Sequence, residues 1–344
     1  MFRPAYTISY RLLNNIKRIA GLTAELNSRR FADVVKVELE KKAREISSFS
    51  STSIEGNPLP LTEVKKILRS KPDSLRDSER EVLNYNQALL NSNQLVDNKK
   101  TGLSLNLILG IQKTITDGLI ADYGCGKTRQ EPVFVNDPRS GKSIYLPPDH
   151  QDVASLLSGL VEYVKQNKAK VDPLIIAGIF HKQFVIIHPF IDGNGRTARL
   201  ATKVLLANMG LNTFNLFSFE NYYNKNVTKY FQKVGVFGNY YDMQRNIDFS
   251  PWLEYFTDGI IDELLRVQKE LKTFAVGPDE ILKTYHRRLL GYIEKHGFIT
   301  DREYAKLTER AKATRSLDFR KLIEMDFIEK LGKGKATYYR LKNP

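Results

Sequence analysis

Cysteine is almost absent from this chain of 344 residues, which contains one, Cys125. One thiol cannot form an internal disulfide, and it cannot supply a zinc or iron-sulfur site built from cysteines. Long apolar runs are also missing, since none approaches the roughly 18 residues that a membrane helix requires. The opening segment lacks the apolar stretch and small-residue site of a secretion signal. The sequence therefore predicts a cytoplasmic protein with no membrane partner.

Internal repeats and low-complexity tracts are absent as well. The composition, 42% hydrophobic and 27% charged, is that of an ordinary globular protein, which excludes a disordered or collagen-like chain. Acidic residues are comparatively few, so the formal net charge is +14 and favours anionic partners such as nucleotides, nucleic acid or acidic protein faces. Residues 281–344 alone carry 16 basic and 8 acidic side chains, more than half of the surplus.

Helical apolar spacing dominates the chain up to about residue 270 and predicts a mainly α body. Two short extended runs, residues 131–135 and 143–148, flank a turn-rich segment and predict a β-hairpin. Gly277-Pro278 predicts a linker, after which short helices precede a strand, a basic glycine turn and a second strand. We therefore divide the chain into residues 1–100, 101–276 and 277–344.

The stretch from His188 to Arg199, HPFIDGNGRTAR, lies between two apolar helical patterns and predicts a loop that opens a helix. Gly193 and Gly195, separated by Asn194, allow successive backbone N–H groups to curl into an anion nest. The positive end of the following helix dipole adds to this nest. Phosphate is therefore the expected ligand of this nest.

Charged side chains surround this nest. Arg196 and Arg199 are three residues apart, so they share one helical face and could hold two phosphate groups. Asp192 would repel bound phosphates unless a hard cation intervenes, which predicts Mg²⁺, or Mn²⁺ in its place. His188 is the side chain here suited to removing a proton near neutral pH. Each residue has an ordinary structural explanation, as core histidine, turn former or solvated helix residue, but the combination favours a site.

These twelve residues match HxFx[DE]GNGRxxR, the motif of the Fic family, at every fixed position, so the chain resembles a Fic protein. The resemblance implies a Fic-type helical core that transfers a nucleotide monophosphate, usually AMP from ATP, to a hydroxyl of a target protein or of itself. It implies that His188 is the general base, that Asp192 holds the metal ion, that Gly193, Asn194 and Gly195 form the anion nest, and that Arg196 and Arg199 contact the β- and γ-phosphates.

Two further segments are similar to parts of the family. The predicted hairpin resembles the flap that docks a target segment by strand pairing. Residues 221–231 are similar to the segment that lines the adenine and ribose pocket, which would place Asn226 and Tyr230 at the nucleotide. Aromatic residues at helical spacing also occur in ordinary cores, so a packing role for this segment stays open.

An inhibitory element is expected upstream of the motif. Ser51 to Gly56, STSIEG, is similar to the [ST]xxxE[GN] motif of Fic proteins that carry their inhibitor N-terminally. Ser51 and Glu55 would share one helix face, and Gly56 could cap the helix after the glutamate. The resemblance implies that Glu55 pairs with Arg199 and denies it to the γ-phosphate. The simpler alternative is a helix that ends in a serine-rich turn, and a reverse, AMP-removing hydrolysis is a secondary hypothesis.

The basic C-terminal segment resembles a small winged helix-turn-helix domain, with helices at 300–307 and 312–325 and a wing at 330–340. DNA is one expected partner, through five basic residues: Lys312, Arg315, Arg320, Lys333 and Lys335. Winged helices also serve as protein-interaction or dimer modules, so a protein partner or a homodimer is the alternative.

Our leading hypothesis is therefore an Mg²⁺-dependent protein adenylyltransferase that uses ATP and is inhibited by its own Glu55. The first alternative is another transfer on the same fold, of UMP, phosphate or phosphocholine, because the nest recognises a diphosphate and not a base. The second is a nucleotide-responsive DNA-binding regulator that uses the nucleotide only as a ligand.

Overall fold

The computed structural model describes residues 2–28, 33–97, 102–136, 143–211, 214–324 and 327–342. The chain forms two compact units, the first from residues 1–30 and 40–267 and the second from residues 31–39 and 268–344. The three-segment division of the sequence, with a boundary near residue 100, remains a prediction beside these two units.

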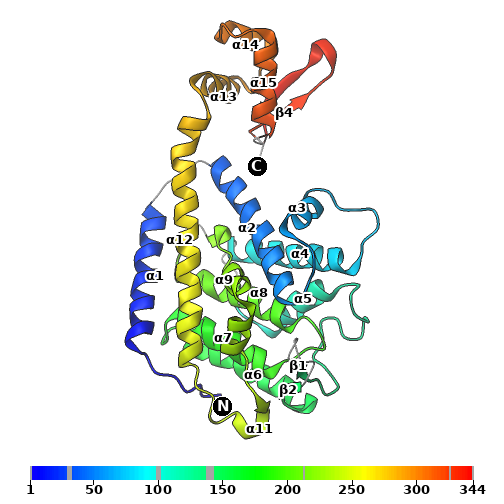
Figure 1. Cartoon of the computed structure of the whole chain (residues 1–344), viewed down its shortest axis with the longest axis vertical. Helices are drawn as coiled ribbons and strands as arrows, with labels where there is room; N and C mark the ends of the chain where they lie inside the picture. The colour runs from blue at the N-terminus through cyan, green and yellow to red at the C-terminus, as the bar shows by residue number, and fades with distance from the viewer. Residues whose placement is uncertain are drawn as a thin grey trace. The chain divides into compact units, whose positions relative to one another are not determined.

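Helices dominate the structure, as the apolar spacing predicted (Figure 1). From the N-terminus they are α1 (Tyr10–Ser28), α2 (Asp33–Ile54), α3 (Leu61–Arg69), α4 (Asp77–Asp97), α5 (Leu105–Thr116), α6 (His150–Asn167), α7 (Pro173–Ile187), α8 (Asn194–Leu206), α9 (Glu220–Lys225), α10 (Val227–Val234), α11 (Tyr240–Met243) and α12 (Ser250–Ile281). Within the described part of the chain, none of the helices combines the length and the apolarity needed to cross a membrane.

Helix α7 lies at the centre of the first unit. Its sequence is apolar on all sides, and nearly all of its residues are buried. Asp172 caps its first turn by accepting a hydrogen bond from Leu174 N at 2.8 Å. On the other side, Trp252 of α12 donates its Nε1–H to Gly178 O at 2.8 Å. Helix α8 packs against α7, so the loop that joins them starts and ends on well-anchored helices.

A small sheet lies beside these helices, in the order β1-β2-β3. Strands β1 (Val135–Asn136) and β2 (Ser143–Leu146) are antiparallel, which confirms the predicted pairing, although β1 shares only Val135 with the predicted run at residues 131–135. The tip, residues 137–142, lies outside the described residues. Strand β3 (Gly238–Asn239) pairs in parallel with β2 and was not predicted, because two residues are too few to show an alternating pattern.

The predicted linker at Gly277-Pro278 is wrong. Helix α12 continues through both residues to Ile281. A proline so close to the end of a helix removes few of its main-chain hydrogen bonds, and the helix is anchored upstream by buried apolar residues such as Leu264 and Leu271. Packing of the preceding turns therefore outweighs the local signal for a break.

In the described part of the second unit, three helices and a β-hairpin follow α12. They are α13 (Thr284–His296), α14 (Asp301–Leu307), α15 (Lys312–Glu324), β4 (Ile328–Leu331) and β5 (Tyr338–Leu341). The strands are antiparallel, and an isolated bridge joins Ile299 to Tyr339 of β5. The winged-helix assignment and its DNA partner remain predictions. Arg315, one of the basic residues proposed for phosphate contact, donates to both carboxylate oxygens of Asp301 at 2.8 and 3.0 Å.

Candidate active site

The loop between α7 and α8 is held in shape by its own residues. His188 ends α7 with a φ of 49°, and its N–H still donates to Phe184 O at 3.0 Å. Gly193 has a φ of 81° just before α8, a conformation that glycine adopts readily. Asn194 closes the loop, because Oδ1 accepts from Phe190 N at 2.9 Å and Nδ2 donates to Phe190 O at 2.8 Å. The conformation of the loop is thus stabilised by hydrogen bonds and backbone turns of its own residues.

The residues predicted to form an anion nest lie at the N-terminus of α8. The helix begins at Asn194, and its first hydrogen bond runs from Thr197 N to Gly193 O at 2.9 Å. The N–H groups of residues 194–196 therefore precede the intrahelical ladder, and the helix dipole places partial positive charge there. An anion bound at this point would receive both contributions.

His188 lies at the edge of the nest with one ring nitrogen already engaged. Its Nδ1 lies 3.3 Å from Val185 O, and a carbonyl can only accept, so Nδ1 carries the proton. Nε2 is then the basic atom. Burial lowers the pKa of the His188 imidazole to about 4, an effect that the hydrogen bond to Val185 and nearby carboxylates oppose. The imidazole is therefore neutral at pH 7 and could accept a proton.

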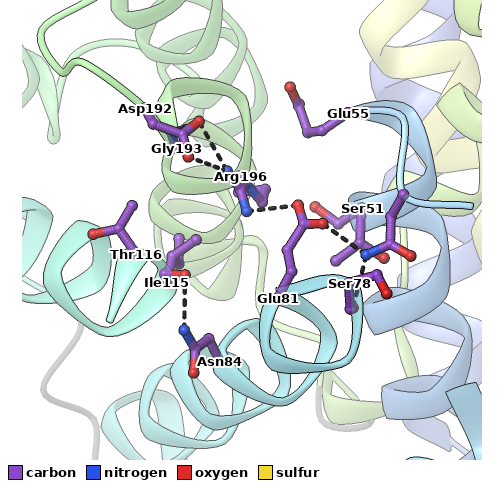
Figure 2. Close-up of polar contacts among 12 residues, drawn as sticks. Ser51, Glu55, Ser78, Glu81, Asn84, Ile115, Thr116, Asp192, Gly193 and Arg196 are labelled. Atoms are coloured by element: carbon purple, nitrogen blue, oxygen red, sulfur yellow. Dashed lines mark hydrogen bonds and ion pairs between the residues drawn. The ribbon is translucent and has the colours of Figure 1, made fainter. Parts of the chain in front are cut away.

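Asp192 and Arg196 are joined across the first turn of α8. The Arg196 Nη2 group donates to both carboxylate oxygens of Asp192 at 3.0 Å, and Gly193 N donates to Oδ1 at 2.6 Å (Figure 2). The two side chains differ in burial, because Arg196 is 5% exposed and Asp192 is 46% exposed. Asp192 therefore presents a carboxylate to solvent beside the nest, while Arg196 lies beneath it.

Arg199 makes its ion pair with the N-terminal region. Its Nη2 donates to Glu55 Oε1 at 2.7 Å and to Ser51 O at 2.9 Å, and its Nε donates to Ser51 Oγ at 2.7 Å. The guanidinium is fully buried, whereas the Glu55 side chain is 28% exposed. Burial alone would lower the pKa of Arg199, but Glu55 raises it above its usual value. The structure thus brings Ser51, Glu55 and Arg199 into direct contact.

Two glycines make this contact sterically possible. Gly56 follows Glu55 with a φ of 96°, so the chain turns sharply after α2. Gly195 lies under the Glu55 carboxylate, since a Cβ built on Gly195 would collide with Glu55 Oε1. The carboxylate therefore lies directly against the first turn of α8, where the nest is.

A cavity of about 500 Å³ opens beside His188. Its walls come from the end of α2, the strands β1 and β2, the end of α7, the start of α8 and one face of α10. The residues that line it include Glu55, Tyr145, His188, Gly195 and Tyr230. Because the lining is mainly apolar beyond the nest, the cavity could accept a flat, weakly polar group next to bound phosphates.

The two residues predicted for the base and ribose differ in position. Tyr230 is buried and lines the cavity, but its ring stacks on Tyr223 at 4.6 Å and its hydroxyl lies 3.0 Å from His181 Nε2. Asn226 is exposed and caps α10, accepting from Lys229 N at 3.0 Å. Tyr230 thus makes the packing contacts of the alternative, whereas Asn226 makes a helix cap, and a role of either residue at the nucleotide stays a prediction.

Arg129 is a residue that sequence reasoning missed. It is buried, and its Nε donates to His188 O at 2.9 Å while Nη1 donates to Glu131 O at 3.0 Å. A third donor group, Nη2, reaches Pro148 O. Arg129 therefore ties the backbone of the motif loop to both sides of the hairpin. A single arginine in an irregular segment carries no pattern that would have revealed this role.

The residues around Asp192 fit the predicted Mg²⁺ ion. No cluster of three or more metal-ligating side chains occurs among the described residues. Mg²⁺ commonly takes only one or two carboxylates and completes its shell with water and substrate phosphates. A half-exposed carboxylate beside an anion nest meets this requirement, so Asp192 could hold the ion together with phosphate oxygens.

Residues 102–206 match the model of the Fic/DOC family. The chain is 28% identical over 166 residues to the protein adenylyltransferase Fic of Nematostella vectensis, which covers 47% of this chain and 37% of that protein. It is 30% identical over 167 residues to the protein adenylyltransferase fic-1 of Caenorhabditis briggsae, and the match covers 47% of this chain and 31% of that protein. The matches thus span less than half of these relatives' lengths.

Solved structures share the fold. The structure of a Fic family protein from Desulfovibrio desulfuricans G20 has a TM-score of 0.65 at 20% identity, covering 100% of this chain and 99% of that chain. Fic-1 of C. elegans, residues 134–508, has a TM-score of 0.59 at 21% identity, covering 76% and 73%. These similarities confirm the predicted mainly helical, Fic-type fold.

Proposed function

Because residues 102–206 of this chain match the model of the Fic/DOC family, we propose that the chain is a protein adenylyltransferase. It transfers AMP from ATP to a hydroxyl side chain of a target protein. The relatives' name supports this activity, and one observation in the site carries it. A neutral imidazole with a free Nε2 lies in one cavity with the N-terminus of a helix that can bind phosphate.

The proposed reaction needs one proton transfer and one displacement. His188 Nε2 accepts the proton of the target hydroxyl, whose oxygen attacks the α-phosphorus of ATP. A new bond forms between this oxygen and phosphorus, and the bond from the α-phosphorus to the oxygen bridging to the β-phosphate breaks. Pyrophosphate leaves with that electron pair, and the target retains AMP as a phosphodiester.

The remaining side chains position the nucleotide in this proposal. The N–H groups at the start of α8 bind the α- and β-phosphates, Arg196 binds the β-phosphate, and Arg199 binds the γ-phosphate. Asp192 holds Mg²⁺, which when bound neutralises charge on the phosphate oxygens. The apolar part of the cavity takes the adenine, against Tyr230. The target segment docks along the hairpin, which supports its hydroxyl next to His188.

Glu55 keeps the proposed enzyme inactive at rest. Its carboxylate pairs with Arg199 at 2.7 Å and lies over Gly195, where phosphate oxygens would otherwise be. The γ-phosphate then lacks its arginine, and ATP cannot bind with its α-phosphorus in line with the target hydroxyl. A hydrogen bond to a charged group contributes about 1.5 to 3 kcal/mol, so this inhibition is reversible by a competing interaction.

Radiolabelled ATP tests the proposed reaction. We expect the Glu55→Gly protein with Mg²⁺ to incorporate label from [α-³²P]ATP into protein, its own chain or an added lysate, and none from [γ-³²P]ATP. Label from [γ-³²P]ATP alone would instead indicate phosphate transfer. Label from [α-³²P]UTP, or a phosphocholine mass increment from CDP-choline, with no label from [α-³²P]ATP, would show that the donor is a different nucleotide.

The rate of transfer should be almost independent of pH between pH 8 and pH 6. Burial lowers the pKa of His188 to about 4, so its basic form persists as the pH falls and is lost only near that value. An ordinary histidine of pKa about 6.5 would already be mostly protonated at pH 5.5. We expect kcat/KM of the Glu55→Gly protein at pH 6 to be within about twofold of that at pH 8. A drop of about fourfold, which an ordinary histidine of pKa about 6.5 would give over this range, would contradict the low-pKa base.

A further inference from the structure

Arg196 has a second carboxylate partner, Glu81, on a helix outside the motif. Glu81 lies in the second turn of α4, and its Oε1 accepts from Arg196 Nη1 at 2.6 Å (Figure 2). The Arg196 guanidinium is therefore held from two sides, by Asp192 through Nη2 and by Glu81 through Nη1. Arg196 Nε is buried and has no acceptor among the described residues, so this donor is unpaired.

The two carboxylates hold Arg196 with unequal strength. The Glu81 side chain is 15% exposed, whereas that of Asp192 is 46% exposed. An ion pair shielded from water is screened less, and loss of its acid leaves a buried charge uncompensated. Glu81 is thus the main anchor of the guanidinium, and Asp192 can turn its free lone pairs to solvent.

Helix α4 is itself firmly placed behind the nest. Asn84, three residues after Glu81, donates its Nδ2 to Ile115 O at 3.2 Å and to Asp117 O at 2.8 Å, at the end of α5. The side chains of Ile115 and Thr116 lie close to Gly193, as Figure 2 shows. Helix α5 thus packs against the backbone of the nest, and α4, which is bonded to the end of α5, carries the carboxylate of Glu81.

The other oxygen of Glu81 contacts the turn that carries Glu55. Asn57 Nδ2 donates to Glu81 Oε2 at 2.7 Å and also to Ser78 O at 2.9 Å. The same side chain fixes its own turn, because Oδ1 accepts from Leu59 N at 3.1 Å. Asn57 lies two residues after Glu55. A continuous chain of contacts thus runs from the inhibitory turn through Glu81 and Arg196 to Asp192.

We propose that Glu81 is a positioning residue for Arg196, holding the guanidinium toward the β-phosphate so that Asp192 is not its sole carboxylate partner. The inference rests on the proposed function. Without the Glu81 charge, Asp192 is the remaining carboxylate partner of Arg196, and the guanidinium is drawn toward it. The site then loses the Arg196 donor for the β-phosphate. It also loses the Asp192 lone pairs that would bind the metal ion. Binding of a nucleoside diphosphate should suffer, and that of a monophosphate should not.

Calorimetric titration of ADP and AMP, each with Mg²⁺, into the Glu55→Gly protein tests this role. In that background, Glu81→Gln should raise the Kd of ADP about tenfold, as loss of an outer partner commonly does, and change that of AMP by less than twofold. Glu162→Gln removes a carboxylate from an exposed position of α6 and should change neither Kd. An unchanged ratio of the two Kd values in Glu81→Gln would overturn the inference while leaving the proposed function intact.

A second variant covers the case that Glu81→Gln does not fold. Asn57→Ala keeps both charges of the pair and removes one donor to Glu81, so we expect ADP binding to weaken about threefold and AMP binding to stay the same. Equal affinities of this variant and its parent for ADP would count against the inference. If the Glu55→Gly parent itself bound ADP no more tightly than AMP, the proposed function would fail, and the inference with it.

Discussion

Replacing His188 with alanine is expected to lower AMP transfer by about three orders of magnitude while leaving nucleotide affinity within about twofold. The imidazole lies at the edge of the phosphate nest and makes its one described hydrogen bond to Val185 O, so its removal takes away a base but no phosphate ligand. General-base catalysis commonly contributes a factor of 10² to 10⁴. The measurement is incorporation of [α-³²P]ATP by the Glu55→Gly protein with and without the second substitution, beside ATP binding by calorimetry.

A comparison of two variants separates chemistry from loop structure. His188→Asn can keep the side-chain donor near Val185 O but has no basic atom, so it should be as inactive as His188→Ala. Retention of more than a tenth of the parental rate by His188→Ala would show that another group removes the proton. Loss of ATP binding in both variants would show that His188 shapes the nest instead.

Replacing Glu55 with glycine should raise AMP incorporation by one to two orders of magnitude. The change removes the carboxylate that pairs with Arg199 at 2.7 Å and lies over Gly195, so the γ-phosphate can reach its arginine. A charge-assisted hydrogen bond of about 1.5 to 3 kcal/mol corresponds to a bias of roughly 10- to 100-fold. Initial rates with [α-³²P]ATP, and the intact mass of the protein after incubation with ATP and Mg²⁺, measure the effect.

The matched control removes an acid elsewhere in the N-terminal region. Asp73→Gly takes a carboxylate from an exposed turn between α3 and α4, and it should leave the rate unchanged. Glu55→Gln keeps the shape of the side chain without its charge, so it should activate partially. Equal incorporation by the parent and the Glu55→Gly protein would contradict inhibition by this residue.

The sequence predicted the contiguous part of the site better than its surroundings. The loop from His188 to Arg199 is short, and its glycines, amide and charges determine its shape through local backbone and capping interactions. The contact between Glu55 and Arg199 spans 144 positions and was expected only because the upstream segment resembles a known motif. Its residues alone would also suit an ordinary helix end.

Residues that act through tertiary contacts could not be found in this way. Glu81 lies in an amphipathic helix in which several acidic side chains look equivalent, and only the packing of α4 near α8 distinguishes it. Arg129 is an isolated basic residue whose buried carbonyl partners come from distant positions. The break expected at Gly277-Pro278 failed for the related reason that packing upstream overrides local propensity.

Any side chain at Gly195 would collide with Glu55. In the resting protein the Glu55 carboxylate therefore lies against this main chain as a bound ligand would. Under the proposed function, the main chain at Gly195 contacts either the Glu55 carboxylate or the phosphates of ATP, and it cannot contact both at once. A substitution there cannot loosen the carboxylate without also disturbing the phosphates. Under the proposed function, the strength of inhibition can therefore change without altering phosphate contacts through the turn that places Glu55, at a position such as Gly56.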